Sequence, residues 1–145
     1  MAMKEGNETP ARMTENLART ICGAAKSTYP DEFIALLRAR EDRVISELIV
    51  LPLSVYGDGF SSINFGMLPI TSDAAGSIHS HPGYENRPSR GDLLFFSRVK
   101  GVHLIVGYPY RKEDIAAYDN LGKRIALEII INSKKAQRKK TERKG

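Results

Sequence analysis

The sequence predicts a single α/β domain in which a mixed β-sheet is flanked by helices. Its length of 145 residues fits one domain. A hydrophobic fraction of 41% with 27% charged residues is typical of a globular chain. Helical and strand-like patterns follow one another in the order helix, strands, helix, strands, which favours helices packed on a sheet. A chain of this length buries roughly two-thirds of its unfolded surface, so it needs no disulfide framework to fold.

The first predicted element is an amphipathic helix from Thr9 to about Ser27. Thr9 would cap this helix, and Pro10 fits its first turn. The dipeptide Tyr29-Pro30 ends it, because the residue before a proline avoids helical angles. Its apolar positions repeat at helical spacing and are Met13, Leu17, Ile21 and Ala24.

Strand-like segments follow this helix. Residues 32–38 (EFIALLR) and 44–51 (VISELIVL) are apolar runs joined by a charged turn, which predicts two strands. Residues 60–67 form a weaker strand-like segment. Residues 75–80 (AGSIHS) predict a short strand that ends before Pro82.

A second helix and a second group of strands complete the pattern. Residues 89–99 predict the helix, and residues 102–108 (VHLIVGY) predict a buried strand in which His103 is a core or sheet-face residue. Residues 115–118 and 125–131 flank Asn120-Leu121-Gly122, which indicates a hairpin. The apolar positions of the helix that are available for the core are Leu93, Leu94, Phe96 and Val99.

Positive charge is concentrated at the C-terminal end of the chain. Residues 133–145 contain seven Lys or Arg and one acid, whereas the whole chain carries a net charge of only +5. This composition predicts a solvated, disordered tail, and the polar residues 1–8 predict a disordered N-terminus. No basic face interleaved with aromatic residues is evident, so nucleic acid is not a favoured partner, although the tail leaves an anionic partner open.

Cysteine usage and hydropathy predict the compartment. The single cysteine, Cys22, excludes an internal disulfide and suits a reducing cytoplasm. No run of about 18 apolar residues is present, and the N-terminus lacks the order of a secretory signal. We therefore expect a cytoplasmic protein with no membrane partner.

The most informative stretch runs from His79 to Asp92. Residues two apart on a strand point to the same face, so His79 and His81 would project side by side, as two ligands of one metal require. Asp92, in the first turn of the second helix, could supply an oxygen ligand. Two imidazoles, one carboxylate and an open fourth position describe a catalytic zinc site rather than a structural one.

Each of these residues also has a simpler interpretation. Ser89 and Asp92 have the spacing of a helix start, in which Ser89 caps the backbone and Asp92 is favoured by the helix dipole. Either histidine alone could be an ordinary core or surface residue. The chain has only three histidines, however, and two of them fall at strand spacing next to a helix start that carries an acid. Capping and metal binding are also compatible.

Hydrolysis by a zinc site also needs a base, for which Glu32 is the candidate. Glu32 opens the strand 32–38 and shares a face with Ile34 and Leu36, and a carboxylate on an apolar strand face suggests a role. The alternative is a glutamate at an exposed strand end. Ser89 is the nearest hydroxyl that could donate a hydrogen bond to a developing oxyanion.

These five residues resemble the motif of a known family. The pattern His79-x-His81-x7-Ser89-x2-Asp92, with Glu32 upstream, is similar to the JAMM motif of MPN-domain zinc metalloproteases. The resemblance covers about residues 10–132, and the surrounding sequence is similar to that of the small archaeal, desampylase-like members. The flanking segments that carry it are 29–37 (YPDEFIALL), 67–70 (MLPI) and 108–110 (YPY).

The resemblance implies a fold and a set of roles. The fold would be a cytidine-deaminase-like MPN fold over residues 9–132. His79, His81 and Asp92 would be zinc ligands with water as the fourth, Glu32 would be the general acid/base, and Ser89 would help to stabilise the tetrahedral intermediate. Segments 56–70 and 108–114 are short, and no spare Cys/His cluster exists, so one Zn²⁺ per chain is expected.

The resemblance also implies an activity. Family members hydrolyse the isopeptide or peptide bond after the C-terminal Gly-Gly of ubiquitin or a ubiquitin-like protein, so the expected partners are ubiquitin-like modifiers and their conjugates. Alternatives are a peptidase of sulfur-carrier metabolism, a non-catalytic MPN scaffold, and a RadC-like protein of the same broad fold. Sheet edges and the first helix offer surfaces for a homodimer.

Overall fold

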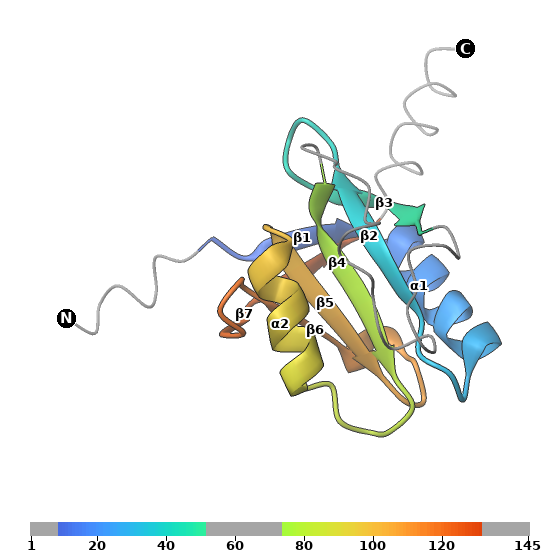
Figure 1. Ribbon diagram of the computed structural model, residues 1–145. Helices are drawn as coiled ribbons and strands as arrows, with labels where there is room; N and C mark the ends of the chain where they lie inside the picture. The colour runs from blue at the N-terminus through green and yellow to red at the C-terminus, as the bar shows by residue number, and fades with distance from the viewer. Residues whose placement is uncertain (1–8, 52–73, 132–145) are drawn as a thin grey trace, which may run out of the picture.

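The computed structural model describes residues 9–51 and 74–131, which form one eight-stranded sheet with a helix on each face (Figure 1). The predictions for residues 1–8, 60–67 and 133–145 lie outside the described residues, so the domain boundaries stay a prediction. The elements in chain order are β1 (Ala11–Thr14), α1 (Glu15–Thr28), β2 (Ile34–Ala39), β3 (Ile45–Val50), β4 (Ala74–His81), α2 (Arg90–Arg98), β5 (Val102–Gly107), the 3-10 turn η4 (Lys112–Asp114), β6 (Ile115–Tyr118), β7 (Arg124–Ile125) and β8 (Leu127–Ile130).

The sheet is mixed, as the sequence predicts. Its strand order is β7-β6-β5-β4-β2-β3-β1-β8, with β4 antiparallel to β2 and parallel to β5. The predicted hairpin is confirmed for its first part, because β6 and β7 pair antiparallel. The rest of the predicted strand 125–131 leaves the hairpin, since β8 pairs with β1 instead. β7 and β8 stand at opposite edges of the sheet, yet only Ala126 separates them in the chain. The sheet is therefore bent until it nearly closes on itself. β4 is a central strand, paired on both sides by β5 and β2.

The start of the first helix differs from the sequence prediction. Residues 11–14 form β1, which pairs with β3 and β8, and the helix begins only at Glu15. The cap is Thr14 rather than Thr9, because the Thr14 hydroxyl accepts a hydrogen bond from the Leu17 amide at 3.1 Å. Met13 is fully buried in the sheet core. The end of the helix at Thr28 agrees with the prediction.

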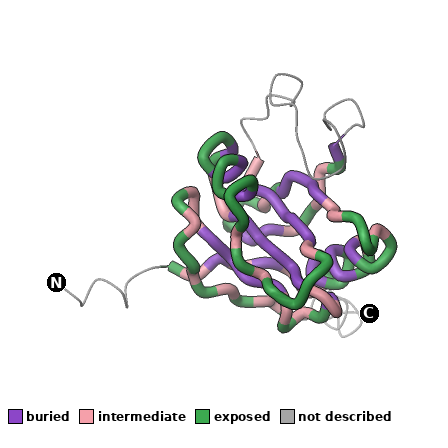
Figure 2. The backbone as a smooth tube through the Cα atoms, turned by 60° about the horizontal axis from the view of Figure 1, so that its bottom comes forward, coloured by how far each residue is buried: buried purple, intermediate pink, exposed green. Residues whose placement is uncertain are grey.

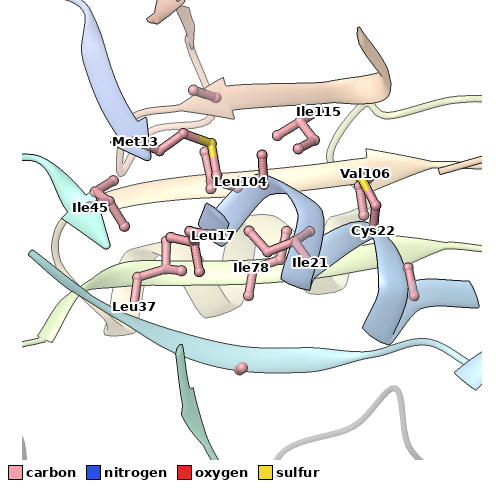
Figure 3. Packing of buried hydrophobic residues seen from close by; sticks show 14 of the residues in the cluster. Met13, Leu17, Ile21, Cys22, Leu37, Ile45, Ile78, Leu104, Val106 and Ile115 are labelled. Carbon is pink, nitrogen blue, oxygen red and sulfur yellow. The ribbon is translucent and has the colours of Figure 1, made fainter. Parts of the chain in front are cut away.

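Two clusters of buried hydrophobic residues hold the helices on the sheet. Figure 2 shows that buried residues are concentrated along the strands. In the first layer, Leu17, Ile21 and Cys22 of α1 belong to one buried cluster with Leu37 and Ile78 of the sheet (Figure 3). In the second layer, α2 covers the opposite face of the sheet. The residues of α2 and of the strands beneath it that form this second layer include Phe95, Phe96, Ile34, Leu36 and Ile105.

The buried face of α2 also corrects a prediction. Leu93 and Leu94 were expected in the core, but they are 40% and 53% exposed. Phe96 and Val99 are buried as predicted, and Phe95, which was not predicted, is buried as well. The reason is that Asp92 faces the sheet, and residues three and four positions further along a helix lie on the same side.

His103 is a buried residue of β5, in agreement with the sequence analysis. Its ring stacks on Phe96, with 4.2 Å between centroids and 12° between the planes. Burial lowers the pKa of His103 to about 4. Its Nε2 is buried without a hydrogen-bond partner of good geometry among the described residues.

Two glycines allow β4 and β5 to approach closely at their N-terminal ends. Gly76 and Gly101 have φ angles of +146° and +133°, a region that side chains with a Cβ rarely adopt. A Cβ on Gly76 would collide with the Val102 carbonyl, and a Cβ on Gly101 would collide with the Ala75 carbonyl. The register of β4 therefore depends on these two residues.

We predict that Gly76→Ala destabilises the protein by more than about 1 kcal/mol, because the native backbone cannot accept the methyl group. Gly23→Ala is the matched control. Gly23 lies in α1 with open space around it, and its replacement should stabilise the helix by about 0.5–1 kcal/mol. Urea unfolding of both variants measures this difference. Equal stabilities of Gly76→Ala and wild type would contradict the close approach of the two strands.

We also predict that the metal-free protein loses stability as the pH falls from about 6.5 to about 4. His103 stays neutral in the folded state over this range, whereas its unfolded value is 6.5. The unfolded chain therefore binds a proton that the folded chain refuses, and stability drops with falling pH. His103→Phe should reduce this slope by up to about 1.4 kcal/mol per pH unit. Denaturation at several pH values tests this, and identical slopes would show that His103 titrates normally.

Candidate metal centre

The C-terminal end of β4 positions two of the predicted residues. His79 and His81 alternate with Ser80 along the strand, so their side chains share one face. β4 pairs antiparallel with β2 in a register that sets Ile34 opposite His79. Backbone bonding continues beyond β2, because the Ser80 amide donates to the Phe33 carbonyl at 2.9 Å.

The same pairing places Glu32 beside His81. In an antiparallel pair, residue numbers fall along one strand as they rise along the other. Continued two residues beyond the pair Ile34 and His79, this register sets Glu32 opposite His81. The Ser80 hydroxyl strengthens this join, because it accepts a hydrogen bond from the Phe33 amide at 2.7 Å. Glu32 therefore precedes the strand rather than opening it, but it keeps the predicted side of the sheet.

Asp92 reaches the histidines from the first turn of α2. Ser89 caps this helix, and its hydroxyl accepts a hydrogen bond from the Asp92 amide at 3.1 Å. In return, the Ser89 amide donates to Asp92 Oδ2 at 2.9 Å. This reciprocal capping box confirms the structural interpretation of both residues. It also holds the carboxylate in place, so capping and a second role are compatible.

His79 is the buried member of the pair. Its side chain is 4% exposed, and its Nδ1 lies 3.5 Å from Asp92 Oδ1. Its Nε2 lies 2.9 Å from the Ser77 hydroxyl. Phe95 packs against the ring edge-on, with 4.7 Å between centroids. Burial lowers the pKa of His79 to about 4, so the ring stays neutral near pH 7.

His81 has the opposite electrostatic environment. Its Nε2 lies 2.8 Å from Asp92 Oδ2, and its Nδ1 lies 3.2 Å from the Glu85 carbonyl. Burial disfavours the charged ring, but the hydrogen bond to Asp92 and the charge of Glu32 outweigh burial and raise the pKa of His81. A carbonyl and a carboxylate both accept, so both ring nitrogens donate here. The Tyr110 hydroxyl fixes the backbone by donating to the His81 carbonyl at 3.0 Å.

The pKa values of the two carboxylates, Glu32 and Asp92, are shifted in opposite directions. The pKa of Glu32 is raised, first by burial and then by the charge of Asp92, with His81 acting against both. The pKa of Asp92 is lowered, because its hydrogen bond to His81 and its other partners together outweigh burial. Glu32 is thus the group that holds a proton more readily, and Asp92 is the group that stays ionised.

The residue types of this donor set, two imidazoles and one carboxylate, are ligands that zinc accepts. Among the residues of segments 9–51 and 74–131, no three His, Cys, Asp or Glu side chains already surround a common ion-sized point. Ligand atoms of a tetrahedral zinc lie about 3.3 Å apart, given bonds of about 2.0–2.1 Å. The distance of 3.5 Å between His79 Nδ1 and Asp92 Oδ1 is close to this spacing. His81 Nε2 lies 2.8 Å from the other carboxylate oxygen, Oδ2, which is a hydrogen-bond distance. Two imidazole nitrogens and a carboxylate oxygen could hold one zinc after a small movement of His81.

The sequence analysis missed two residues of the site's surroundings. Ser77 lies two positions before His79 on the same face of β4, so the strand period that linked the histidines could have found it. Its partner His103 was recognised only as a core residue. Their contact, with 2.6 Å between Ser77 Oγ and His103 Nδ1, depends on the pairing of β4 with β5. No local pattern predicts that pairing.

The chain matches a known family and known structures. Residues 14–120 match the family model of prokaryotic homologues of the JAB domain. A curated relative from Haloferax volcanii, described as a probable metalloprotease, is 33% identical over 116 residues, which cover 74% of this chain and 71% of the relative. No helix within residues 9–51 and 74–131 is long and apolar enough to cross a membrane.

Two solved structures are similar along nearly their whole length. One is described as a JAMM metalloprotease-like zinc site in the proteasome and signalosome, with 36% identity, a TM-score of 0.66, and coverage of 84% of this chain and 99% of that one. The other is a JAB1/MPN domain protein from Archaeoglobus fulgidus, with 39% identity, a TM-score of 0.66, and coverage of 82% and 98%. A Desulfitobacterium hafniense protein, at 16% identity and a TM-score of 0.57 with coverage of 83% and 92%, shares the fold alone.

These likenesses confirm the predicted JAMM/MPN fold and indicate a zinc-dependent metalloprotease family. The chain belongs to the JAMM/MPN+ family of metalloproteases, in its prokaryotic JAB branch.

Proposed function

We propose that this protein is a zinc-dependent isopeptidase or peptidase that cleaves the bond after the C-terminal Gly-Gly of a ubiquitin-like protein. The observation that carries the proposal is the convergence of His79, His81 and Asp92 beside Glu32. His79 Nδ1, His81 Nε2 and Asp92 would hold one zinc per chain. When bound, zinc supplies a Lewis acid that acidifies water and polarises a carbonyl.

Glu32 is the general acid/base of the proposed reaction. Burial raises its pKa, and a group with a pKa nearer to neutrality both takes and returns a proton more effectively. It accepts the proton of the attacking water and delivers it to the leaving amine. Its place opposite His81 puts the carboxylate next to the metal ligands.

Ser89 is the donor to the developing oxyanion. Its hydroxyl oxygen accepts from the Asp92 amide, which leaves the hydroxyl proton available for donation. Because Ser89 is fixed by the capping box, this donor needs no reorganisation during the reaction.

The substrate class is supported by the family resemblance, since members of the family cleave the bond after the C-terminal Gly-Gly of ubiquitin or a ubiquitin-like protein. The expected partners are therefore ubiquitin-like modifiers and their conjugates. Several tyrosines lie near the backbone of His81. The Tyr108 ring centroid lies 5.1 Å from that of Tyr29 and 5.5 Å from that of Tyr84, and the ring also contacts Tyr110, whose hydroxyl donates to the His81 carbonyl.

We predict that the protein, purified without chelators, contains about one zinc per chain and that His81→Ala loses most of it. The substitution removes one of three protein ligands. Glu85→Ala is the control, because it changes an exposed side chain beside the site and keeps the carbonyl that contacts His81. Elemental analysis measures the content. Equal zinc in His81→Ala and wild type would refute the ligand set.

We predict that the wild-type protein releases a ubiquitin-like protein from a fusion in which Gly-Gly precedes the cleaved bond, and that Glu32→Gln lowers turnover by about 10²–10⁴-fold with zinc retained. Glu41→Gln, beyond the other end of β2, should cleave like wild type. Cleavage is followed by mass spectrometry. Equal cleavage of a fusion with Ala-Ala in place of Gly-Gly would contradict the substrate class, and loss of zinc from Glu32→Gln would make Glu32 a ligand.

A further inference from the structure

A buried row of three polar side chains lies behind the metal centre. Ser77 and His103 are fully buried, and His79 is 3% exposed. The Ser77 hydroxyl lies 2.9 Å from His79 Nε2 and 2.6 Å from His103 Nδ1. The row therefore links the ring nitrogen of His79 that faces away from Asp92 to a second imidazole on the neighbouring strand.

Strand register and one aromatic ring fix this row. The parallel pairing of β4 and β5 sets Ser77 opposite His103. Phe96 stacks on His103 and meets His79 at an angle of 66°, with 5.6 Å between centroids. Phe96 lies on α2, one turn after Asp92. The same helix therefore carries a proposed ligand and packs against both rings of the row.

If the Ser77 hydroxyl accepts from one ring and donates to the other, the tautomers of the two histidines are coupled. If His79 presents the lone pair of Nδ1 toward Asp92, its proton is on Nε2 and is donated to the Ser77 oxygen. The Ser77 hydroxyl then donates to His103 Nδ1, which leaves the proton of His103 on Nε2. In the reverse arrangement His103 donates to Ser77, Ser77 donates to His79, and the proton of His79 is on Nδ1, where it blocks a metal.

The distance between His79 and Asp92 favours the first arrangement. His79 Nδ1 and Asp92 Oδ1 are 3.5 Å apart, which is long for a hydrogen bond from a proton on Nδ1. We therefore assign the proton of His79 to Nε2, which faces the Ser77 hydroxyl.

We propose that Ser77 and His103 are positioning residues, which hold His79 in the tautomer whose Nδ1 lone pair faces the metal position. The inference rests on the proposed metal centre and deepens it. Partners behind a ligating histidine fix its ring and its tautomer, and their loss typically weakens metal binding about 10–100-fold. Here a serine relays that constraint from a second buried histidine.

Nitrogen-15 NMR of the metal-free, full-length protein tests the tautomer directly and needs no substitution. The expected result is a proton on Nε2 of His79 and on Nε2 of His103. A proton on Nδ1 of His79 in the wild-type protein would overturn the proposal.

Zinc affinity, measured by competition with a chromophoric chelator, tests the relay. Ser77→Ala and His103→Phe should each weaken binding about 10–100-fold, although phenylalanine preserves the stack on Phe96. Ser77→Thr and His103→Asn should recover most of the affinity, because they restore a hydroxyl and an acceptor at the position of His103 Nδ1. Thermal unfolding of every variant shows whether the fold is retained. Unchanged affinity in folded Ser77→Ala and His103→Phe would overturn the relay.

The failure of this inference is distinguishable from the failure of the proposed function. A wild-type protein without zinc affinity would remove the metal centre and the relay with it. A wild-type protein that binds zinc no more tightly than its folded Ser77→Ala variant would remove the relay alone. Neither measurement needs the substrate.

Discussion

The site depends on the hydrogen bonds of one carboxylate. Asp92 Oδ2 accepts a hydrogen bond from the Ser89 amide and lies 2.8 Å from His81 Nε2. Asp92 thereby joins the start of α2 to the end of β4, two elements that otherwise meet through the aromatic layer of Phe95 and Phe96. Because the capping box already fixes the carboxylate, its second oxygen faces His79 without further ordering of the side chain. The helix start thus contributes both stability and geometry.

Burial and nearby charge shift the pKa values of the two histidines in opposite directions. Burial keeps His79 neutral, which leaves a lone pair for a metal, whereas Asp92 and Glu32 favour the charged form of His81. The two carboxylates therefore stabilise a positive charge on His81, and in the metal-free protein that charge is a proton. A divalent cation competes with that proton for the same nitrogen and gains more from the same carboxylates. The protein would thus favour a metal through the charges that it already holds.

Local patterns predicted the parts of this structure that depend on local physics. The strand period linked His79 with His81, and the helix-start spacing linked Ser89 with Asp92. Thr14 shows the limit of such patterns. The helical spacing of apolar residues already begins at Met13, which predicts a helix there. Pairing with β3 and β8 nevertheless makes residues 11–14 a strand. Likewise, Leu94 is exposed because the side of α2 that carries Asp92 faces the sheet. The position of the sheet beneath α2 decides which side that is, and the helix sequence alone does not.

No local pattern predicted the contacts between strands that are distant in the sequence. These contacts bring two residues to the proposed site. Glu32 reaches the site through the pairing of β2 with β4, and His103 reaches it through the pairing of β4 with β5. Both pairings share β4, whose start is held against β5 by Gly76. A bound zinc would in turn stabilise this arrangement, since a ligand at about 1,000 times its Kd adds about 4 kcal/mol to the folded state. Metal binding at this site would therefore be coupled to the register of β4, and a substitution that weakens one would also weaken the other.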